Sequence, residues 1–329
     1  MNNILSLHGA DPENLYRSFN LPIPDRVIDF STNTNALTWP EIHVDVERLA
    51  SHYPDNECRK LRELIASRED ISPSRVTFTS GSNEAIFALS HVFTGRTAIL
   101  QPTYTEYRRA FKNARDIFTL DDAGGYEAVI LSNPNNPTGK FMPDLSRRVM
   151  NCPDTVFIVD EAYIDFLREE KPERLCIFPN VVVLRSLTKI FHLSGARIGY
   201  VIANEEISAA LRSFLPSWNV NSFAQELALY FLNDSAFYEA TREFYRVNTP
   251  LFMEDLRQSG FEVMSSDVHY FLVRVEDDGE VIRHLLRHGI AVRHTRNFPG
   301  LEGRYIRVAT RCPEDNARLI AAMKEIARP

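Results

Sequence analysis

The most reactive grouping in the sequence is a lysine that follows two hydroxyl residues. Ser186 and Thr188 lie just before Lys189, and Arg197 comes eight positions after it, with glycines nearby. A lysine amine forms Schiff bases with carbonyl compounds, and hydroxyl groups together with an arginine can hold a phosphate. The grouping therefore suits an aldehyde that carries a phosphate, such as pyridoxal 5'-phosphate. An exposed basic loop would have the same composition, so the interpretation needs support from the rest of the chain.

Further candidate residues follow the ends of predicted strands, where open α/β sheets bind their ligands. Ser82 and Asn83 come shortly after Val76–Thr79 and open a predicted helix, whose first N–H groups can bind phosphate. An ordinary helix cap is the alternative for this pair. Tyr104 follows Thr97–Leu100 and could stack on a planar ring, or it could simply pack in the core.

Two later strand ends carry an amide, a carboxylate and a phenol. Asn136 lies in the loop Ser132–Gly139, which has two prolines and three asparagines, and it could donate to the phenolate oxygen of a pyridine cofactor. Asp160 ends the strand Thr155–Asp160, where a buried carboxylate is costly without a cationic partner. A protonated ring nitrogen would be that partner. Tyr163 could reach the same phenolate oxygen as Asn136; a plain turn and a helix cap are the alternatives for Asn136 and Asp160.

Short runs of β-branched and aromatic residues alternate with helical stretches through the middle of the chain. Several of the runs are apolar on both faces, which indicates a parallel sheet buried between layers of helices. The strands expected in this sheet are Val76–Thr79, Thr97–Leu100, Ala128–Ser132, Thr155–Asp160, Val181–Arg185 and Gly199–Ala203.

The pattern changes after residue 205. Helices are expected to about residue 260, with Pro216 and Pro250 as breaks or kinks. Strands and helices then follow in an order typical of a small α+β domain. The expected elements are strands Phe261–Met264, His269–Val275, Ile290–His294 and Tyr305–Ala309, a helix over Glu280–His288 and a last helix from Pro313.

The first residues of the chain are expected to form an arm. They carry four prolines and one expected strand, Val27–Phe30, and we expect them to dock on the small domain. The predicted division is an arm over residues 1–44, a large cofactor-binding domain over residues 45–228 and a small C-terminal domain over residues 229–329.

Composition limits the other classes of function. The 329 residues carry a net charge of −7 without a basic stripe, which argues against a nucleic-acid partner. No apolar run approaches membrane-spanning length and no leader is recognisable, so we expect a cytoplasmic protein without a membrane partner. The four cysteines are far apart and lack the spacing of metal ligands, so no metal site is expected; they are Cys58, Cys152, Cys176 and Cys312.

The order and spacing of these residues resemble the fold-type-I pyridoxal-phosphate enzymes. Within them, the chain is most similar to the branch of histidinol-phosphate aminotransferases and their decarboxylating relatives, over nearly its whole length. The resemblance implies an α/β fold, with a mostly parallel sheet sandwiched by helices in a large domain, plus a small α+β domain. It implies Lys189 as the Schiff-base lysine, Asp160 as the ring-nitrogen partner, Asn136 and Tyr163 as donors to the phenolate, and Tyr104 as the stacking ring.

The resemblance also implies a phosphate site and a dimer. Phosphate contacts are expected from Ser82, Asn83, Ser186, Thr188 and Arg197. In this branch a tyrosine of a Tyr-Pro pair binds the phosphate in the neighbouring subunit. Here that pair is Tyr53-Pro54, which implies a homodimer with shared sites.

Within the branch, four segments resemble the threonine-phosphate decarboxylases of cobalamin biosynthesis. This chain departs from those enzymes at two places. It has Ala10 where they have a second glycine, and its stretch between Leu120 and Val129 is shorter than theirs. Histidinol-phosphate aminotransferases usually carry an acidic residue where this chain has Thr34. The four segments are His8–Asp11, Asp29–Asn35, Trp218–Ser222 and Val292–Ala309.

Two arginines near the C-terminus suit an acidic substrate. Arg293 and Arg307 lie on or near predicted strands, and the planar guanidinium fits carboxylate and phosphate oxygens; exposed ion pairs are the alternative. The resemblance implies that Arg307 binds the amino-acid carboxylate and Arg293 the substrate phosphate, helped by the backbone of His8-Gly9 and by Asn35.

The leading hypothesis is a lyase that decarboxylates L-threonine O-3-phosphate, or L-serine O-phosphate, to an amino alcohol phosphate. An aminotransferase of the histidinol-phosphate type stays open, because decarboxylation and transamination use the same side chains. A non-catalytic regulator that binds the cofactor is the third hypothesis. It would need a DNA-reading extension, for which we expect no room before His8.

Overall fold

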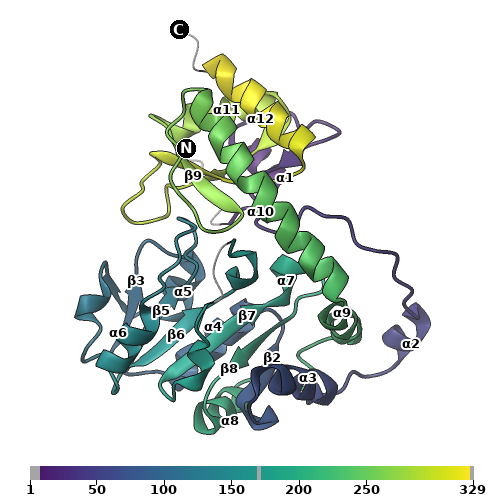
Figure 1. Cartoon of the computed structure of the whole chain (residues 1–329), viewed down its shortest axis with the longest axis vertical. Helices are drawn as coiled ribbons and strands as arrows, with labels where there is room; N and C mark the ends of the chain where they lie inside the picture. Colours follow the sequence, from purple (N-terminus) through teal and green to yellow (C-terminus); the bar gives the residue numbers. More distant parts are fainter. Residues whose placement is uncertain (1–7, 169–171, 327–329) are drawn as a thin grey trace.

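A seven-stranded sheet lies at the centre of the larger part of the molecule (Figure 1). The computed structural model describes residues 8–168 and 172–326. The strand order is β2-β8-β7-β6-β5-β3-β4; β8 runs antiparallel to both of its neighbours, and the other four pairs are parallel. The mostly parallel sheet expected from the sequence is therefore confirmed. The strands are β2 (Val76–Thr79), β3 (Thr97–Leu100), β4 (Arg115–Ile117), β5 (Ala128–Ser132), β6 (Val156–Asp160), β7 (Val181–Ser186) and β8 (Gly199–Ile202).

Both faces of this sheet are covered, because its central strands carry runs of apolar residues that point to both sides. On β5, Ile130 packs with helices of one layer, whereas its neighbours Val129 and Leu131 pack in the core on the other face. The first layer contains α4 (Ser82–Val92), α5 (Thr105–Ala110) and α8 (Glu205–Ser213); the second contains α3 (Arg59–Glu69), α6 (Leu145–Asn151) and α9 (Ser222–Asn233).

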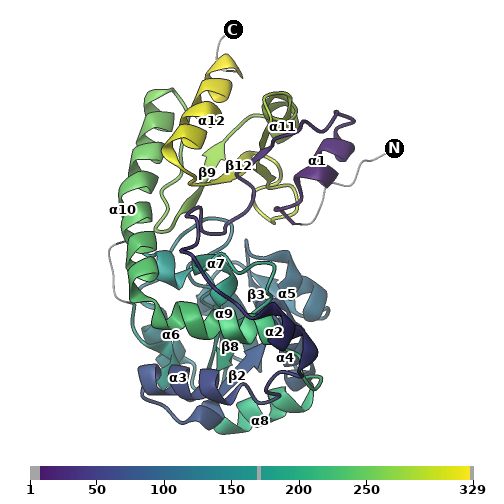
Figure 2. The same ribbon diagram turned by 90° about the vertical axis from the view of Figure 1, so that its right-hand side faces the viewer.

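A smaller part is built on a three-stranded antiparallel sheet of order β11-β12-β9 (Figure 2). Phe271 and Val273 of this sheet pack with Leu285 and Leu319 of the helices that cover it. The elements are β9 (Tyr270–Arg274), α11 (Asp278–Arg287), β11 (Arg293–His294), β12 (Tyr305–Ala309) and α12 (Pro313–Ile326).

The start of the chain packs against this smaller part. Strand β1 (Ile28–Asp29) pairs in parallel with β10 (Ile290–Ala291). The helix α1 (Pro12–Ser18) places Leu15 and Tyr16 in the core of the smaller part. This helix was not expected. It forms because Asp11 accepts a hydrogen bond from the N–H of Asn14 and because proline is favoured at a helix start.

The single expected strand Ile290–His294 is two strands, since β10 pairs with β1 and β11 pairs with β12. The expected strand Phe261–Met264 is reduced to a bridge between Val263 and Val273. The edge strand β4 was missed because two of its three side chains are polar and exposed.

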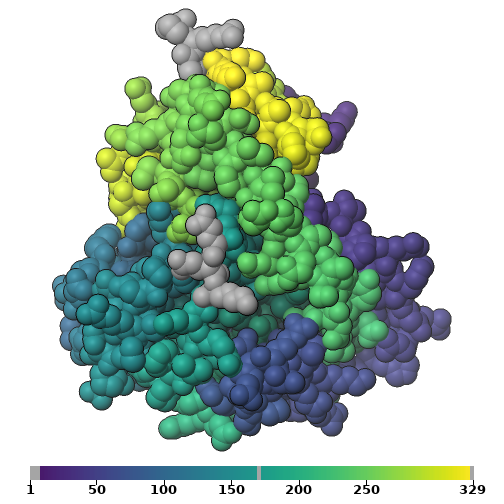
Figure 3. Space-filling model, viewed as in Figure 1, coloured from purple at the N-terminus to yellow at the C-terminus, as the bar shows by residue number. Residues whose placement is uncertain are grey.

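One long helix, α10 (Ser235–Gln258), continues through Pro250. Pro216, in contrast, lies between α8 and α9. Tyr245 of α10 packs in the core of the larger part and Phe252 in the core of the smaller part. This packing outweighs the one backbone hydrogen bond that a proline removes. Figure 3 shows α10 on the surface across the waist where the two parts meet.

The predicted boundary between residues 228 and 229 lies inside α9, so the division into domains stays a prediction.

A further short helix, α2 (Val46–Ser51), follows the arm. None of the described helices has the length and apolar character needed to cross a bilayer.

Candidate active site

A cavity of about 150 Å³ lies where β2, β3, β5, β6 and β7 end. Its walls are side chains that follow those strands, as expected for an open α/β sheet. Nine of the residues proposed from the sequence to hold the cofactor meet here: Ser82, Asn83, Tyr104, Asn136, Asp160, Tyr163, Thr188, Lys189 and Arg197.

Lys189 lies on the short helix α7 (Leu187–Ile190), directly after β7. Its Nζ atom is 6.0 Å from the ring centre of Tyr163. The amine makes no hydrogen bond or ion pair with the described parts of the chain, and the side chain is half-buried. It is therefore an available nucleophile inside the cavity.

Asp160 is 6% exposed at the end of β6. Its Oδ2 accepts a hydrogen bond of 2.8 Å from the hydroxyl of Tyr107, and its Oδ1 accepts one of 2.9 Å from the N–H of Ala162. Burial raises the pKa of the Asp160 carboxyl group, while these hydrogen bonds and the charge of Lys189 oppose the rise. A cation in the cavity would favour the charged form of Asp160 and so lower this pKa. Tyr107 was not singled out from the sequence.

One end of the cavity is suited to an anion. Helix α4 begins there at Ser82, after Gly81 with φ of +77°. A Cβ atom on Gly81 would lie 2.6 Å from the guanidinium of Arg197, so the glycine lets that cation approach the helix start. Thr188 is hydrogen-bonded to Ser186 at 2.7 Å between their oxygens, so Ser186 contacts the cavity only through Thr188. A helix N-terminus beside an arginine and hydroxyl groups can hold a phosphate.

Tyr104, Asn136 and Tyr163 also line the cavity. Arg307 donates to Asn136 Oδ1 at 2.5 Å, and a guanidinium can only donate. The amide oxygen therefore faces Arg307. The NH₂ group of Asn136 makes no hydrogen bond within residues 8–168 and 172–326, which leaves it for a ligand. Tyr104 donates to Asn83 Oδ1 at 3.2 Å.

A second cavity, of about 120 Å³, shares Tyr104, Asn136, Tyr163 and Lys189 with the first. The smaller part of the molecule and the arm supply its remaining walls. Of the predicted substrate contacts, four line it: His8, Gly9, Arg293 and Arg307.

The two arginines lie opposite each other on paired strands. Arg293 of β11 and Arg307 of β12 are register partners, and both are buried. Like charges at such positions repel each other. Burial lowers the pKa of both guanidinium groups, and the positive charge of Arg307 lowers the pKa of Arg293 further.

Arg307 has no carboxylate partner within the described residues. Its Nη2 donates to the carbonyl oxygen of Ser31 at 2.7 Å, and its buried Nε atom has no hydrogen-bond partner there. Arg293 donates to Asn297 Oδ1 at 2.9 Å and lies over the ring of Phe298. The buried charge of Arg307 has no counter-ion within the described residues, which is costly, so an anionic ligand would stabilise this site.

The family follows from comparison with known proteins. A family model described as "Aminotransferase class I and II" matches residues 119–323. The chain belongs to this family. Pyridoxal phosphate is therefore its cofactor, as predicted, and the cavity beside Lys189 contains donors that fit an aldehyde, a ring nitrogen and a phosphate. The predicted fold-type-I architecture is confirmed as well.

Within the aminotransferase family, relatives with two activities are similar to this chain. It is 32% identical over 337 residues to a threonine-phosphate decarboxylase of Salmonella typhimurium, covering 92% of each. It is 28% identical to a histidinol-phosphate aminotransferase of Desulfitobacterium hafniense, covering 93% of each. A third relative, the adenosylcobalamin biosynthesis bifunctional protein CobDQ of Leptospira interrogans, is 29% identical over 92% of this chain, which spans only 39% of that protein.

A solved structure supports the same family. The crystal structure of L-threonine-O-3-phosphate decarboxylase from Porphyromonas gingivalis is similar, with a TM-score of 0.80 and 26% identity. The match covers 86% of this chain and 93% of that one.

The start of the described chain closes the second cavity of this family member. A Cβ atom on Gly9 would lie 2.5 Å from the carbonyl oxygen of Ser31, so only glycine fits there. Ala10, with φ of +62°, occupies a backbone region that favours glycine, at a cost of about 1 kcal/mol.

His8 Nε2 lies 2.9 Å from Oε1 of the buried Glu106, which also binds Arg109. Burial lowers the pKa of His8 more than Glu106 raises it, so His8 is neutral at neutral pH and donates to the carboxylate. Glu106 was missed in the sequence because nothing along the chain links it to residue 8.

Besides Ser186, two predicted site residues lie outside both cavities. The NH₂ group of Asn35 donates to the Ile190 carbonyl and to Thr241 Oγ1, and its oxygen accepts from the N–H of Leu37. Asn35 therefore has no free group for substrate, contrary to the prediction; it anchors the arm to α7. Asn33, two residues earlier, lines the second cavity instead.

Tyr53 is the other residue outside the cavities. It is 82% exposed, and its ring centre lies 4.8 Å from that of Trp218. A role of Tyr53 in the site of its own chain is therefore excluded by position, and a role in a neighbouring subunit stays a prediction.

Proposed function

We propose that this protein decarboxylates L-threonine O-3-phosphate, or the related L-serine O-phosphate, to an amino alcohol phosphate for cobamide biosynthesis. The observation that carries the proposal is the pair of buried arginines in a cavity that also reaches Lys189. A substrate with both a carboxylate and a phosphate would supply an anion to each arginine. Similarity to threonine-phosphate decarboxylases adds support.

The residues of the first cavity would hold pyridoxal phosphate. When bound, the cofactor supplies an aldehyde for amines and a ring that accepts the electron pair released at the substrate Cα. Lys189 would bind the aldehyde and would give or take a proton at Cα. Asp160 would keep a proton on the ring nitrogen, and Asn136 and Tyr163 would donate to the phenolate oxygen. The ring of Tyr104 would stack on the cofactor, and the phosphate would be bound by Ser82, Asn83, Thr188 and Arg197, with Ser186 supporting Thr188.

The second cavity would decide which bond at Cα is broken. Arg307 would bind the substrate carboxylate, and Arg293 would bind its phosphate with the backbone of His8-Gly9. These contacts would hold the substrate so that the bond from Cα to the carboxylate has the orientation needed for cleavage. If the Cα–H bond took that orientation, Lys189 would remove the proton and transamination would follow. This is the alternative function, and similarity to histidinol-phosphate aminotransferases keeps it open.

The two functions are separated by incubating the purified protein with L-threonine O-3-phosphate. Release of carbon dioxide together with an amino alcohol phosphate, without a keto acid, is the expected result. Turnover of histidinol phosphate that requires a keto acid, with no carbon dioxide from threonine phosphate, would establish the alternative. If the protein with pyridoxal phosphate lacked the absorption band of a lysine Schiff base, or if that band were unaffected by Lys189→Ala, the hypothesis of a non-catalytic regulator would instead gain support.

Arg307→Lys tests the carboxylate contact. We expect kcat/KM for threonine phosphate to fall by about a hundredfold, because lysine keeps the charge but loses the planar pair of donors. Arg304→Lys is the matched control, since Arg304 is exposed and contacts only Glu302 among the described residues. Cofactor absorbance should be normal in both variants. Normal turnover by Arg307→Lys would remove Arg307 from the substrate site.

We also propose a homodimer with shared sites. Tyr53 is exposed far more than most tyrosines, and a partner subunit would cover it. Light scattering is expected to give twice the chain mass of 37.7 kDa. Tyr53→Phe is expected to weaken cofactor phosphate binding by about tenfold through loss of one hydrogen bond to a charged group. A monomer with full activity would contradict the dimer. The cytoplasmic location stays a prediction.

A further inference from the structure

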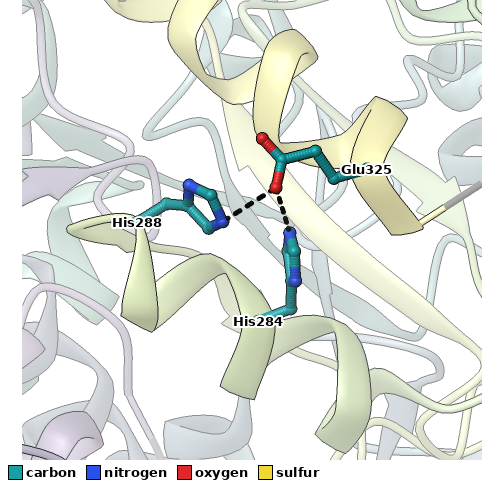
Figure 4. Close-up of side chains that lie close together, drawn as sticks. All are labelled: His284, His288 and Glu325. Carbon is teal, nitrogen blue, oxygen red and sulfur yellow. Dashed lines mark ion pairs between the residues drawn. The ribbon is translucent and has the colours of Figure 1, made fainter.

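Two histidines and a glutamate meet on the surface of the smaller part, on elements that contribute no residue to either cavity wall described above. His284 lies in the last turn of α11, and His288 is the C-cap residue four positions later, so their side chains project from the same side of the helix end. Glu325 reaches them from the neighbouring helix α12 (Figure 4). The spacing of the cysteines gives no indication of a metal site, whereas His284 and His288 are four positions apart in the sequence, a spacing that suits metal ligands on a helix.

The donor atoms of the three side chains converge. One oxygen of Glu325, Oε2, lies 3.3 Å from His288 Nε2 and 3.9 Å from His284 Nε2. The donor atoms of all three residues lie within 4.8 Å of one another. In a tetrahedral zinc site, bonds of 2.0–2.2 Å place the ligand atoms about 3.4 Å apart. The pair formed by His288 and Glu325 already has that separation. His284 Nε2 must move about half an ångström closer to Glu325 Oε2, and the two imidazole nitrogens, which lie within 4.8 Å of each other, must reach the same spacing.

We propose that His284, His288 and Glu325 bind a divalent transition metal ion of the zinc type, which links α11 to α12. Two imidazoles and one carboxylate are ligands that suit zinc, nickel or copper. They do not suit magnesium or calcium, which prefer oxygen ligands throughout. The three side chains are between about a quarter and a half exposed, so an ion can enter and water can complete the coordination.

One hydrogen bond must change when the metal binds. His284 Nε2 lies 3.0 Å from the carbonyl oxygen of Ala322 and donates to it when protonated. Metal binding requires the lone pair of Nε2, so the proton must reside on Nδ1. Both tautomers of a neutral imidazole are accessible, and the proximity of the Glu325 carboxylate favours a cation at this position.

The ion would act on the attachment of the last helix. Leu319 and Met323 of α12 pack with Leu285 and Leu286 of α11 in the smaller core. The metal would join the same two helices at their solvent-exposed side, near the end of α12. It would stabilise the folded chain without contacting the residues around Lys189.

Zinc titration of the tag-free full chain, stripped of metal and loaded with pyridoxal phosphate, tests the site. Calorimetry and metal analysis are expected to give one zinc ion per chain at this site, and zinc should raise the Tm. His288→Ala and Glu325→Gln should each weaken zinc binding by at least about tenfold and remove the Tm increase, since even outer partners of a metal site contribute that much. Magnesium should neither bind at this site nor raise the Tm.

His43→Ala is the matched control. His43 is an exposed imidazole 3.6 Å from a carboxylate oxygen of Glu41, but it is not part of a group of three such ligands in the described chain. Its replacement should leave zinc affinity unchanged. The Tm of each metal-free variant checks that it folds. The proposal is overturned if the chain binds no zinc, or if His288→Ala and Glu325→Gln bind it as tightly as the unaltered protein.

Discussion

Replacing Lys189 by alanine is expected to reduce turnover by at least about 10⁴-fold, because loss of a covalent nucleophile removes most of an enzyme's rate enhancement. The Nζ atom of Lys189 is the amine that lines both cavities. The variant therefore loses the group that binds the cofactor aldehyde and the group that moves a proton at the substrate Cα. Alanine is a good helix former, so α7 should persist.

The measurement combines activity with chemical labelling. Borohydride treatment of the holoenzyme should attach the cofactor to the peptide that contains Lys189, and the alanine variant should stay unlabelled. Lys112→Ala is a suitable control because Lys112 is exposed and lies outside both cavities. If Lys189→Ala kept normal turnover, or if the label lay on another lysine, the proposed role of the cavity would be wrong.

The ends of the central strands could be predicted from the sequence because two simple rules act together. Runs such as Ala128–Ser132 begin with four successive apolar residues, which is typical of strands buried on both faces. In a parallel sheet the residues after such strands meet at one edge. Asp160 and Lys189, which are 29 positions apart, were placed in one site by these rules alone.

Contacts between distant segments could not be predicted in this way. The hydrogen bond from Tyr107 to Asp160 and the contact of His8 with Glu106 depend on how α5 and the arm lie on the sheet. No periodicity in the chain encodes these pairs. Tyr107 did offer one signal, since it follows Tyr104 by three positions, the spacing that places side chains on the same face of a helix such as α5.

The arm shows a second limit of sequence reasoning. Asn33 and Asn35 belong to one polar run, yet Asn33 lines a cavity and Asn35 is fully bonded inside the protein. The run has irregular backbone, so neither the strand period nor the helix period tells which side chains face the ligand. Pro250 is the converse case, in which packing at both ends of α10 overrides a strong local signal.

Asp160→Asn is expected to lower kcat by about 10²–10³-fold, the usual loss when one preorganised electrostatic group is removed. The amide of asparagine can accept from the N–H of Ala162 through its oxygen and donate to the hydroxyl of Tyr107 through its NH₂ group, so the cavity should keep its shape. It has no negative charge, however, and would not hold a proton on a ring nitrogen. Cofactor affinity should fall along with kcat. Asp122→Asn, which alters an exposed aspartate, should change neither.

Asp160→Asn should lower kcat and cofactor affinity, but it should leave the stability of the cofactor-free protein unchanged or increase it. Burial raises the pKa of Asp160 in the folded chain. A carboxyl group with a raised folded pKa disfavours folding as the pH rises above its unfolded pKa, and the penalty is complete above the folded pKa. Asparagine removes this penalty, so without cofactor the Tm of Asp160→Asn at neutral pH should equal or exceed that of the unaltered protein. A variant that was less stable without cofactor, yet bound cofactor normally, would show that Asp160 serves the fold. If cofactor affinity falls while stability without cofactor does not, the negative charge of Asp160 serves to bind a cationic ligand and does not serve the fold.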